Sequence, residues 1–382
     1  MLIDVFCRII DNLGDAAVVG RLARGLVLCD GSLRVRLFFS GVETFTALVP
    51  ETLPQIRFWD VEKSRNDPDA APGDADVLIE AFGESPPDWY QEAFRGGRLS
   101  ALKCRLVLHL EYLTAEAWAQ EYHLLPSPTG VPGVEKYFFV PGFSERTGGV
   151  FLDPEFLKLK SQRMLLRRAL EQRWTPGVAE KSLWLLVFSY EHDYSSFWKD
   201  LADWSLSNDQ TAVVFSASGR SAEGVRSSFQ SIAAHPGTKN IRLQELPFLP
   251  QTAFDALLLA CDFLIVRGED SWVRAVLSGK PFLWHAYLQA DAHQRVKVDA
   301  FLAVAKPFFK GKEDLFEAWS REFRSLNDRR YDSWTEPARE RYGILLERRV
   351  ELEAVLEQFA DWVENHLNLE RSLLEFIGRF RL

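Results

Sequence analysis

Short apolar segments alternate with helical patterns twice along this sequence. The first series spans residues 2–140 and the second spans residues 183–285. Near-continuous apolar runs separated by helices are typical of parallel strands, because helices cover both faces of such a sheet. The predicted strands are residues 2–9, 34–40, 55–60, 76–82, 104–111, 137–140, 183–189, 212–216, 241–243, 263–266 and 281–285. We therefore predict an α/β protein with two doubly wound, Rossmann-like domains.

The segments between these series predict the domain boundaries. Residues 142–153 hold three glycines, and Thr175, Pro176 and Gly177 interrupt the chain again. The expected domains are residues 1–150 and 180–310, followed by a helical tail over residues 311–382 that would brace both. Doubly wound sheets bind ligands at the carboxyl ends of their strands. We therefore expect two facing domains with the site in the gap between them.

Charge and composition exclude several classes of protein. The net charge is −9 and no Lys/Arg block is present, which argues against general binding to nucleic acid or an anionic membrane. No apolar run reaches about 18 residues, and the N-terminus lacks the pattern of a signal peptide. None of the four cysteines forms a CxxC pair, which indicates buried free thiols in a reducing compartment. We expect a cytoplasmic protein.

Several common catalytic motifs are missing from the sequence. It contains no GxSxG, no GxxxxGK[ST] and no GxGxxG, which argues against the usual hydrolase, nucleotide-triphosphatase and dinucleotide-binding sites. The seven histidines show no metal-ligand spacing, so we expect no metal site.

An acidic turn, Asp11-Asn12-Leu13-Gly14-Asp15, follows the first predicted strand. Its position is that of a nucleotide-binding glycine turn, but carboxylates replace the usual glycines. Two aspartates four residues apart could supply general-base chemistry. Alternatively, Asp15 could only cap the following helix and Asp11 could only fix the turn.

A second turn, Arg267-Gly268-Glu269-Asp270-Ser271, follows the predicted strand at residues 263–266. Backbone amides at the start of the next helix could bind a phosphate, with Arg267 adding a charge-assisted bond and Ser271 capping the helix. Glu269 and Asp270 would repel a phosphate, so we expect them to contact hydroxyls or to orient Arg267. The alternative is a capped helix with a surface ion pair.

Two further side chains lie near predicted strand ends. Tyr190 could stack on a nucleobase, or it could be an aromatic side chain at the rim of the core. Gln251 opens a helix, where its amide could bind a pyrimidine edge or simply face solvent.

Taken together, these turns resemble one family, the elongation factor P arginine rhamnosyltransferases. The resemblance covers about residues 4–305, and its most specific part is RGEDS followed by GKPFLWHAY. The matching stretches are FCRIIDNLGDAAVVGRLAR, VLIEAFGE, LEYLTAEAWAQEYHLLPSP, KYFFVPGFSERTGG, LLVFSYE, FLPQTAFDALLLACDFLIVRGEDSWVRAVLSGKPFLWHAYLQADAH and KVDAFL. Departures include Leu13, where the family usually carries phenylalanine, and the helix AAVVGRLAR.

The resemblance implies a metal-independent, inverting GT-B glycosyltransferase without a cofactor. It would transfer rhamnose from dTDP-β-L-rhamnose to an arginine of elongation factor P. It implies that Asp15 is the base and that Asp11 and Glu269 are further catalytic residues. The donor-binding residues that it implies are Asn12, Leu13, Gly14, Asp15, Tyr190, Gln251, Arg267, Gly268, Glu269, Asp270 and Ser271.

Other functions stay open on the sequence. The chain could be a GT-B transferase with a different nucleotide sugar or acceptor. It could also be a non-catalytic protein that binds a translation factor. A Rossmann oxidoreductase is disfavoured because the glycine fingerprint is missing.

Overall fold

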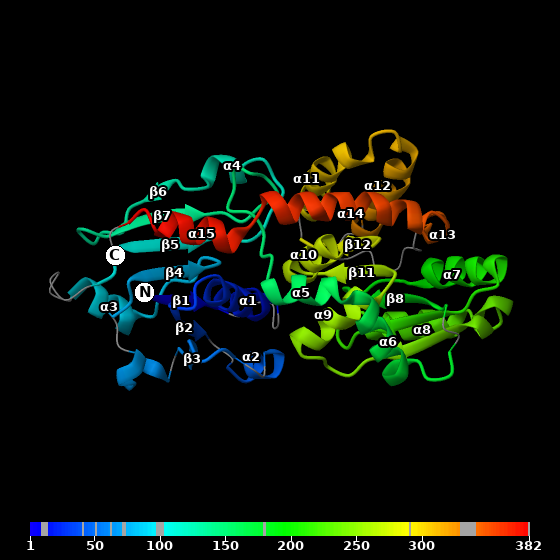
Figure 1. Ribbon diagram of the computed structural model, residues 1–382, viewed down its shortest axis with the longest axis horizontal. Helices are drawn as coiled ribbons and strands as arrows, with labels where there is room; N and C mark the ends of the chain where they lie inside the picture. Colours follow the sequence, from blue (N-terminus) through cyan, green and yellow to red (C-terminus); the bar gives the residue numbers. More distant parts are fainter. Residues whose placement is uncertain are drawn as a thin grey trace. The chain divides into compact units, whose positions relative to one another are not determined.

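The computed structural model describes residues 1–8, 14–39, 42–49, 52–61, 63–70, 74–96, 103–178, 181–289, 292–328 and 341–380. The chain divides into two compact units (Figure 1). The first unit comprises Met1–Glu155 and Val363–Leu382, and the second comprises Phe156–Trp362. Each unit contains one sheet, so the predicted α/β class with two Rossmann-like sheets is confirmed.

The sheet of the first unit has seven strands in the order β3-β2-β1-β4-β5-β7-β6. All neighbours pair in parallel except the short β6, which pairs antiparallel with β7. The strands are β1 (Leu2–Cys7), β2 (Arg34–Phe39), β3 (Ile56–Asp60), β4 (Val77–Ala81), β5 (Leu106–Leu110), β6 (Pro126–Ser127) and β7 (Glu135–Phe139). The strand order reverses between β1 and β4, which is where such a sheet leaves a crevice.

Alternating side chains of this sheet fill two separate apolar cores. Val5 belongs to the core under α1 and α15, whereas its neighbour Phe6 points to the opposite face and stacks on Phe38 at 4.6 Å. Tyr90 of α3 completes the second core. The helices of this unit are α1 (Gly14–Cys29), α2 (Val42–Leu48), α3 (Asp88–Gly96), α4 (Ala119–Tyr122) and α15 (Leu369–Ile377), with 3-10 turns η1 (Ser64–Asn66) and η2 (Pro68–Ala70).

The last helix, α15, packs into the first unit although it lies at the end of the chain (Figure 1). The buried carboxylate of Glu370 accepts hydrogen bonds from the backbone N–H groups of Leu152 and Asp153. Asp153 is also fully buried and forms ion pairs with Arg21, at 2.6 Å, and with Arg24. These polar groups join α1, the segment before α5, and α15.

The sheet of the second unit has five parallel strands in the order β10-β9-β8-β11-β12. The strands are β8 (Leu183–Val187), β9 (Ala212–Ser216), β10 (Ile241–Glu245), β11 (Phe263–Arg267) and β12 (Phe282–His285). They agree with the predicted apolar runs. Here the strand order reverses between β8 and β11.

Helices cover both faces of this second sheet (Figure 1). They are α5 (Pro154–Ser161), α6 (Arg163–Trp174), α7 (Ser195–Asn208), α8 (Ala222–Ser231), α9 (Gln251–Ala260), α10 (Glu269–Ser278), α11 (Gln294–Ala305), α12 (Glu313–Asn327), α13 (Tyr342–Glu347) and α14 (Arg349–His366), with 3-10 turns η4 (Pro236–Asn240) and η5 (Lys306–Phe309). α5 and α6 are two separate helices that meet at Gln162. α14 begins in the second unit and its last residues belong to the first.

Aromatic side chains contribute mainly to packing in the second unit. Trp272 stacks on Trp284 at 3.9 Å between ring centroids, and both rings are buried. The indole N–H of Trp319 donates to the carbonyl of Phe282 at 2.8 Å, which satisfies its polar group inside the core. The high aromatic content of the sequence thus has a structural explanation here.

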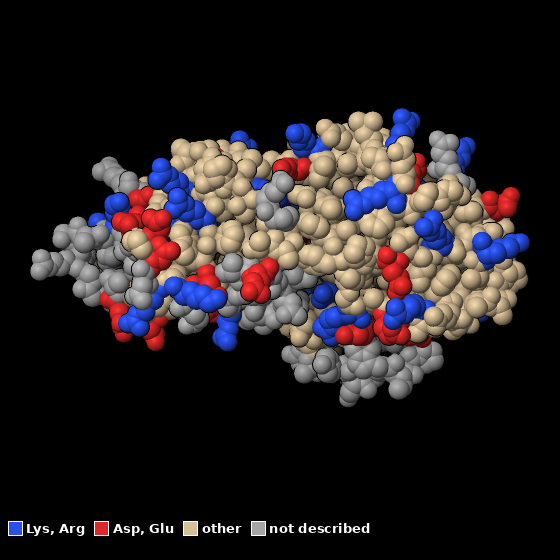
Figure 2. All heavy atoms as spheres, turned by 90° about the horizontal axis from the view of Figure 1, so that it is seen from below, with Lys and Arg blue, Asp and Glu red and all other residues tan. Residues whose placement is uncertain are grey.

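The surface carries both signs of charge. On the face shown in Figure 2, Lys and Arg side chains are interspersed with Asp and Glu, and the described residues there form no continuous basic tract. No helix within the described ranges is long and apolar enough to cross a membrane. Cys7, Cys104 and Cys261 are buried free thiols, but Cys29 is exposed, contrary to the expectation for all four.

Substituting Asp153→Asn is expected to destabilise the first unit by about 3–5 kcal/mol, because it removes the carboxylate that neutralises the buried Arg21. The matched control is Asp69→Asn, which breaks the exposed Arg57–Asp69 pair and is expected to cost less than about 1 kcal/mol. Urea unfolding followed by circular dichroism measures both. Equal losses in the two variants would contradict the role assigned to Asp153.

Candidate functional site

The turn after β11 lies beside the point where the strand order of the second sheet reverses. Gly268 has a φ of +70°, which an L residue rarely adopts, and a Cβ at this position would meet no atom within 4 Å. The amides that open α10 therefore border open space. α10 begins at Glu269 with Gly268 as its N-cap, so the predicted capping by Ser271 is wrong: Ser271 lies within the first turn and is buried.

Asp270 is held by two neighbouring side chains. Its carboxylate lies 3.8 Å from the guanidinium of Arg274, which is completely buried, and accepts a hydrogen bond from the amide of Gln251 at 3.2 Å. Gln251 is itself buried, so the alternative that its amide faces solvent is wrong. The second acid of the turn is therefore paired and fixed rather than directed freely at a ligand.

Tyr190 lies in the loop after β8, on the other side of the same crevice. Its ring is 2% exposed, and the guanidinium carbons of Arg267 and Arg220 lie 4.8 Å and 5.0 Å from the ring centroid. The rings of His285 and Tyr287 contact it edge-on. Stacking of a nucleobase on Tyr190, as predicted from the sequence, would require one of these neighbours to move.

In the first unit, Asp15 lies in the first turn of α1 and is 5% exposed. The hydroxyl of Tyr112 donates to Oδ1 of Asp15 at 3.4 Å, and the ring of Tyr112 stacks on Phe82 at 4.3 Å. Phe82 follows β4 and Tyr112 follows β5, so the carboxyl edge of the sheet brings these side chains to Asp15. Asp11, Asn12 and Leu13 lie outside the described residues, and Gly14 opens α1.

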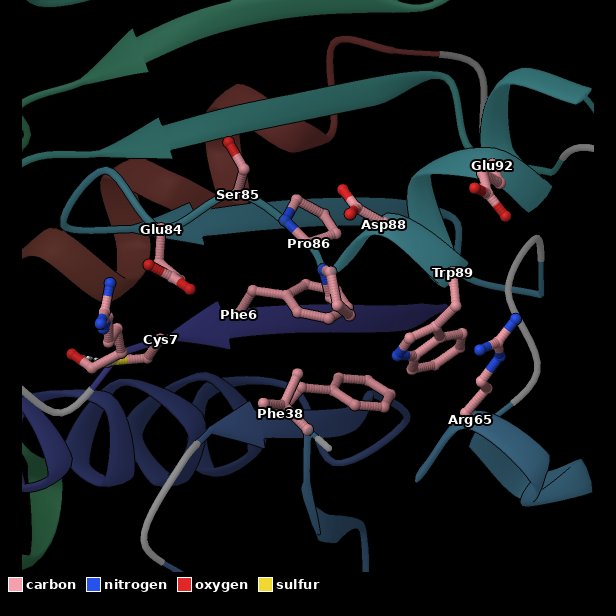
Figure 3. A pocket seen from close by; sticks show the side chains of 13 residues that line it. Phe6, Cys7, Phe38, Arg65, Glu84, Ser85, Pro86, Asp88, Trp89 and Glu92 are labelled. Carbon is pink, nitrogen blue, oxygen red and sulfur yellow. Dashed lines mark hydrogen bonds between the residues drawn. The ribbon is translucent and has the colours of Figure 1, made fainter. Parts of the chain in front are cut away.

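A cavity of about 810 Å³ lies along the face of the first sheet, with Cys7 and Arg8 among its lining residues (Figure 3). Phe6, Phe38 and Trp89 contribute aromatic rings to it, and Glu84 lies near Cys7 at the end of β1. Burial, with the nearby charges of Asp15 and Glu84, raises the pKa of the Cys7 thiol. Other charged lining residues are Arg8, Arg65, Asp88 and Glu92.

A half-buried charged cluster lies on the same sheet, formed by Glu80 of β4, His109 of β5, Lys136 of β7 and Glu111. His109 lies 3.0 Å from Glu111, and Lys136 donates to Glu80 at 2.5 Å. Hydrogen bonds to Glu111 and Glu80 raise the pKa of His109 to about 9, although burial opposes the change. The protonated imidazole of His109 therefore lies between the carboxylates of Glu80 and Glu111. Glu111 directly precedes Tyr112 in the sequence.

Some of these residues were not identified from the sequence. Tyr112 and Arg220 are examples, because each is defined by a contact with a residue distant in sequence, Asp15 or Tyr190. The only available signal was position, since each follows a predicted strand by a few residues. Within the described part of the chain, no group of three or more His, Cys, Asp or Glu side chains is placed to hold a metal ion.

Two Rossmann-like units of this kind are the architecture of the GT-B fold class. A solved structure of EarP, described as mediating arginine glycosylation of translation elongation factor EF-P, has a TM-score of 0.63 and 23% identity and covers 99% of both chains. A UDP-GlcNAc 2-epimerase from Neisseria meningitidis shares the fold with a TM-score of 0.54 at 10% identity, over 100% of both chains.

Sequence comparison places the chain within that class. The family model described as "Elongation-Factor P (EF-P) rhamnosyltransferase EarP" matches residues 3–378. The protein-arginine rhamnosyltransferase of Pseudomonas putida is 35% identical over 84% of this chain and 87% of its own length. That of Neisseria meningitidis is 33% identical over 80% of this chain and 79% of its own. The chain belongs to the EF-P rhamnosyltransferase family.

Histidine titration tests the charged cluster. By NMR, His109 is expected to titrate near pH 9, whereas burial lowers the pKa of His123 to about 4. Because the pKa of His109 is above its ordinary 6.5 in the folded state, protonation of His109 stabilises the fold, and this contribution is fully present below about pH 6.5. That contribution is lost as the pH rises through 9.

The variant Glu111→Gln tests whether the carboxylate of Glu111 raises the pKa of His109. It removes the larger of the two carboxylate contacts, so the midpoint of His109 is expected to move down toward 6.5 while His123 is unchanged. A wild-type His109 that already titrates near 6.5 would contradict this description of the cluster.

Proposed function

We propose that this chain transfers rhamnose from dTDP-β-L-rhamnose to an arginine side chain of elongation factor P, with inversion at the anomeric carbon. The observation that carries the proposal is Asp15, a buried carboxylate at the carboxyl edge of the first sheet within a chain of this family. The relatives named protein-arginine rhamnosyltransferases support the reaction class. We propose a cytoplasmic location, because the proposed acceptor is a translation factor.

The acceptor poses a problem of basicity that a carboxylate can solve. A guanidinium has a pKa above 12 and no free lone pair, so it is a poor nucleophile in its ordinary state. A carboxylate can hold it by paired hydrogen bonds and accept a proton as the new N–C bond forms. We assign this role to Asp15, with Asp11 holding the guanidinium, and we assign acceptor binding to the first unit.

The donor requires a site for two phosphates and a sugar. The amides that open α10, together with Arg267 and Ser271, are suited to the charge that develops on the leaving diphosphate. Gly268 permits close approach, and Glu269 would orient the sugar or the acceptor nitrogen. We assign the remaining donor contacts to Asn12, Gly14, Tyr190, Gln251 and Asp270, without a metal ion.

In a single-displacement mechanism, the new bond forms and the old bond breaks in one step. The arginine nitrogen forms a bond to the anomeric carbon as the bond to the phosphate oxygen breaks. The proton from nitrogen goes to Asp15 and dTDP leaves with the bonding electron pair. A β-configured donor therefore gives an α-linked product.

Intact-mass measurement tests the function directly. Elongation factor P incubated with this protein and dTDP-β-L-rhamnose is expected to gain the mass of one deoxyhexose, with an α linkage by NMR. The controls are UDP-glucose as donor and elongation factor P with lysine at the target arginine, neither of which should give the product. Transfer from UDP-glucose but not from dTDP-rhamnose would reject the proposed donor.

Substituting Asp15→Asn tests the base assignment. The variant keeps the size of the side chain but cannot accept the proton, so kcat is expected to fall by about 10²–10⁴-fold. The control is Asp30→Asn, just beyond the other end of α1 and exposed, where kcat should be unchanged. Transfer at the wild-type rate by folded Asp15→Asn protein would remove Asp15 from this role.

A further inference from the structure

A diphosphate at the start of α10 faces an unfavourable charge balance. Arg267 supplies one positive charge, but Glu269 and Asp270 in the same turn are acids. Arg274 offsets Asp270 from inside the core, where it is completely buried and cannot reach a ligand. Binding a diphosphate, with a charge of about −2 to −3, therefore calls for a second accessible cation nearby.

We propose that Arg220 is this second cation and that it binds the diphosphate of the donor together with Arg267. The proposal rests on the proposed function, because it adds a residue to the same donor site. Arg220 follows β9, which pairs with β8, and β8 in turn pairs with β11, so the three loops adjoin at one edge of the sheet.

The position of Arg220 is fixed by contacts with the loop after β8. Its guanidinium lies over the ring of Tyr190, 5.0 Å from the centroid, and the guanidinium of Arg267 lies over the same ring at 4.8 Å. Because Tyr190 is buried, it holds both cations in place rather than moving with them. A cation held against an aromatic ring loses little side-chain entropy when a ligand binds.

The carboxylate of Glu191 orients Arg220 without using all of its donors. Nε of Arg220 donates a hydrogen bond to Oε1 of Glu191 at 2.8 Å, and Nη2 forms an ion pair with Oε2 at 2.8 Å, so the carboxylate meets one side of the forked guanidinium. Within the described residues, the Nη1 group makes no hydrogen bond or ion pair. The side chain is 39% exposed, so these remaining N–H groups are accessible to a ligand.

Glu191 interacts with both cations. Burial tends to raise the pKa of Glu191, but the hydrogen bond from Arg220 and the charges of Arg220 and Arg267 lower it below its ordinary value. Glu191 thus interacts with two guanidinium groups, so Arg220, Arg267 and Glu191 together carry a net charge of +1. This charge is what the diphosphate would neutralise.

Binding of dTDP and of thymidine to Arg220→Met tests this assignment. Methionine keeps the unbranched, apolar part of the side chain but removes the guanidinium with its donors and charge. The variant is expected to bind dTDP about tenfold more weakly or worse by calorimetry, the size of a lost charge-assisted hydrogen bond. Thymidine, followed by ligand-observed NMR, should bind as it does to the wild type, because it has no phosphate.

Matched controls separate phosphate binding from a structural effect. Arg226→Met on α8 removes a cation that also bridges two carboxylates, Glu223 and Glu245, and should leave dTDP binding unchanged. Arg220→Lys keeps the charge without the fork and should recover part of the affinity. Unchanged dTDP affinity in Arg220→Met, or an equal loss for thymidine and dTDP, would overturn the proposal.

The same measurements distinguish a failure of the Arg220 proposal from a failure of the donor assignment. If wild-type protein prefers UDP to dTDP, the donor assignment fails, and the comparison of Arg220→Met with wild type is then made with UDP and uridine. If wild-type protein binds neither diphosphate, both proposals are wrong.

Discussion

Parallel strand pairing is the constraint on which the rest of this structure depends. Each parallel connection must return to the start of the next strand, so all loops that follow a strand lie along one edge of the sheet. This brings Asp15, Phe82 and Tyr112 together in the first unit, although nearly a hundred residues separate the first from the last. In the second unit it brings Tyr190 and Arg267 to either side of one crevice.

Two acids near the proposed donor site of the second unit are each paired with an arginine. Asp270 is offset by the fully buried Arg274, and Glu191 is offset by Arg220. Both pairs leave the open approach beside Gly268 free of an exposed, unpaired carboxylate from these residues. Asp270, the second acid of the family motif, is therefore tolerated because the buried Arg274 compensates its charge.

Buried polar contacts also explain why the chain ends in the unit where it began. Glu370 of α15 accepts two backbone N–H groups at residues 152 and 153, and Asp153 neutralises Arg21. The close packing of α15 on α1 requires Gly25, because a Cβ there would lie 2.7 Å from the Glu370 side chain. The segment that the sequence marks only as a glycine-containing boundary thus holds a buried ionic centre.

The sequence alone determined the strands, the two sheets and the family, because apolar periodicity and motif order are local properties of the chain. It did not determine that Ser271 lies inside a helix capped by Gly268, that Gln251 is buried against Asp270, or that Tyr190 lies under two guanidinium groups. Those outcomes depend on side chains from different strands meeting at one edge. Only the tertiary structure decides such contacts, since burial and pairing are set by neighbours distant in sequence.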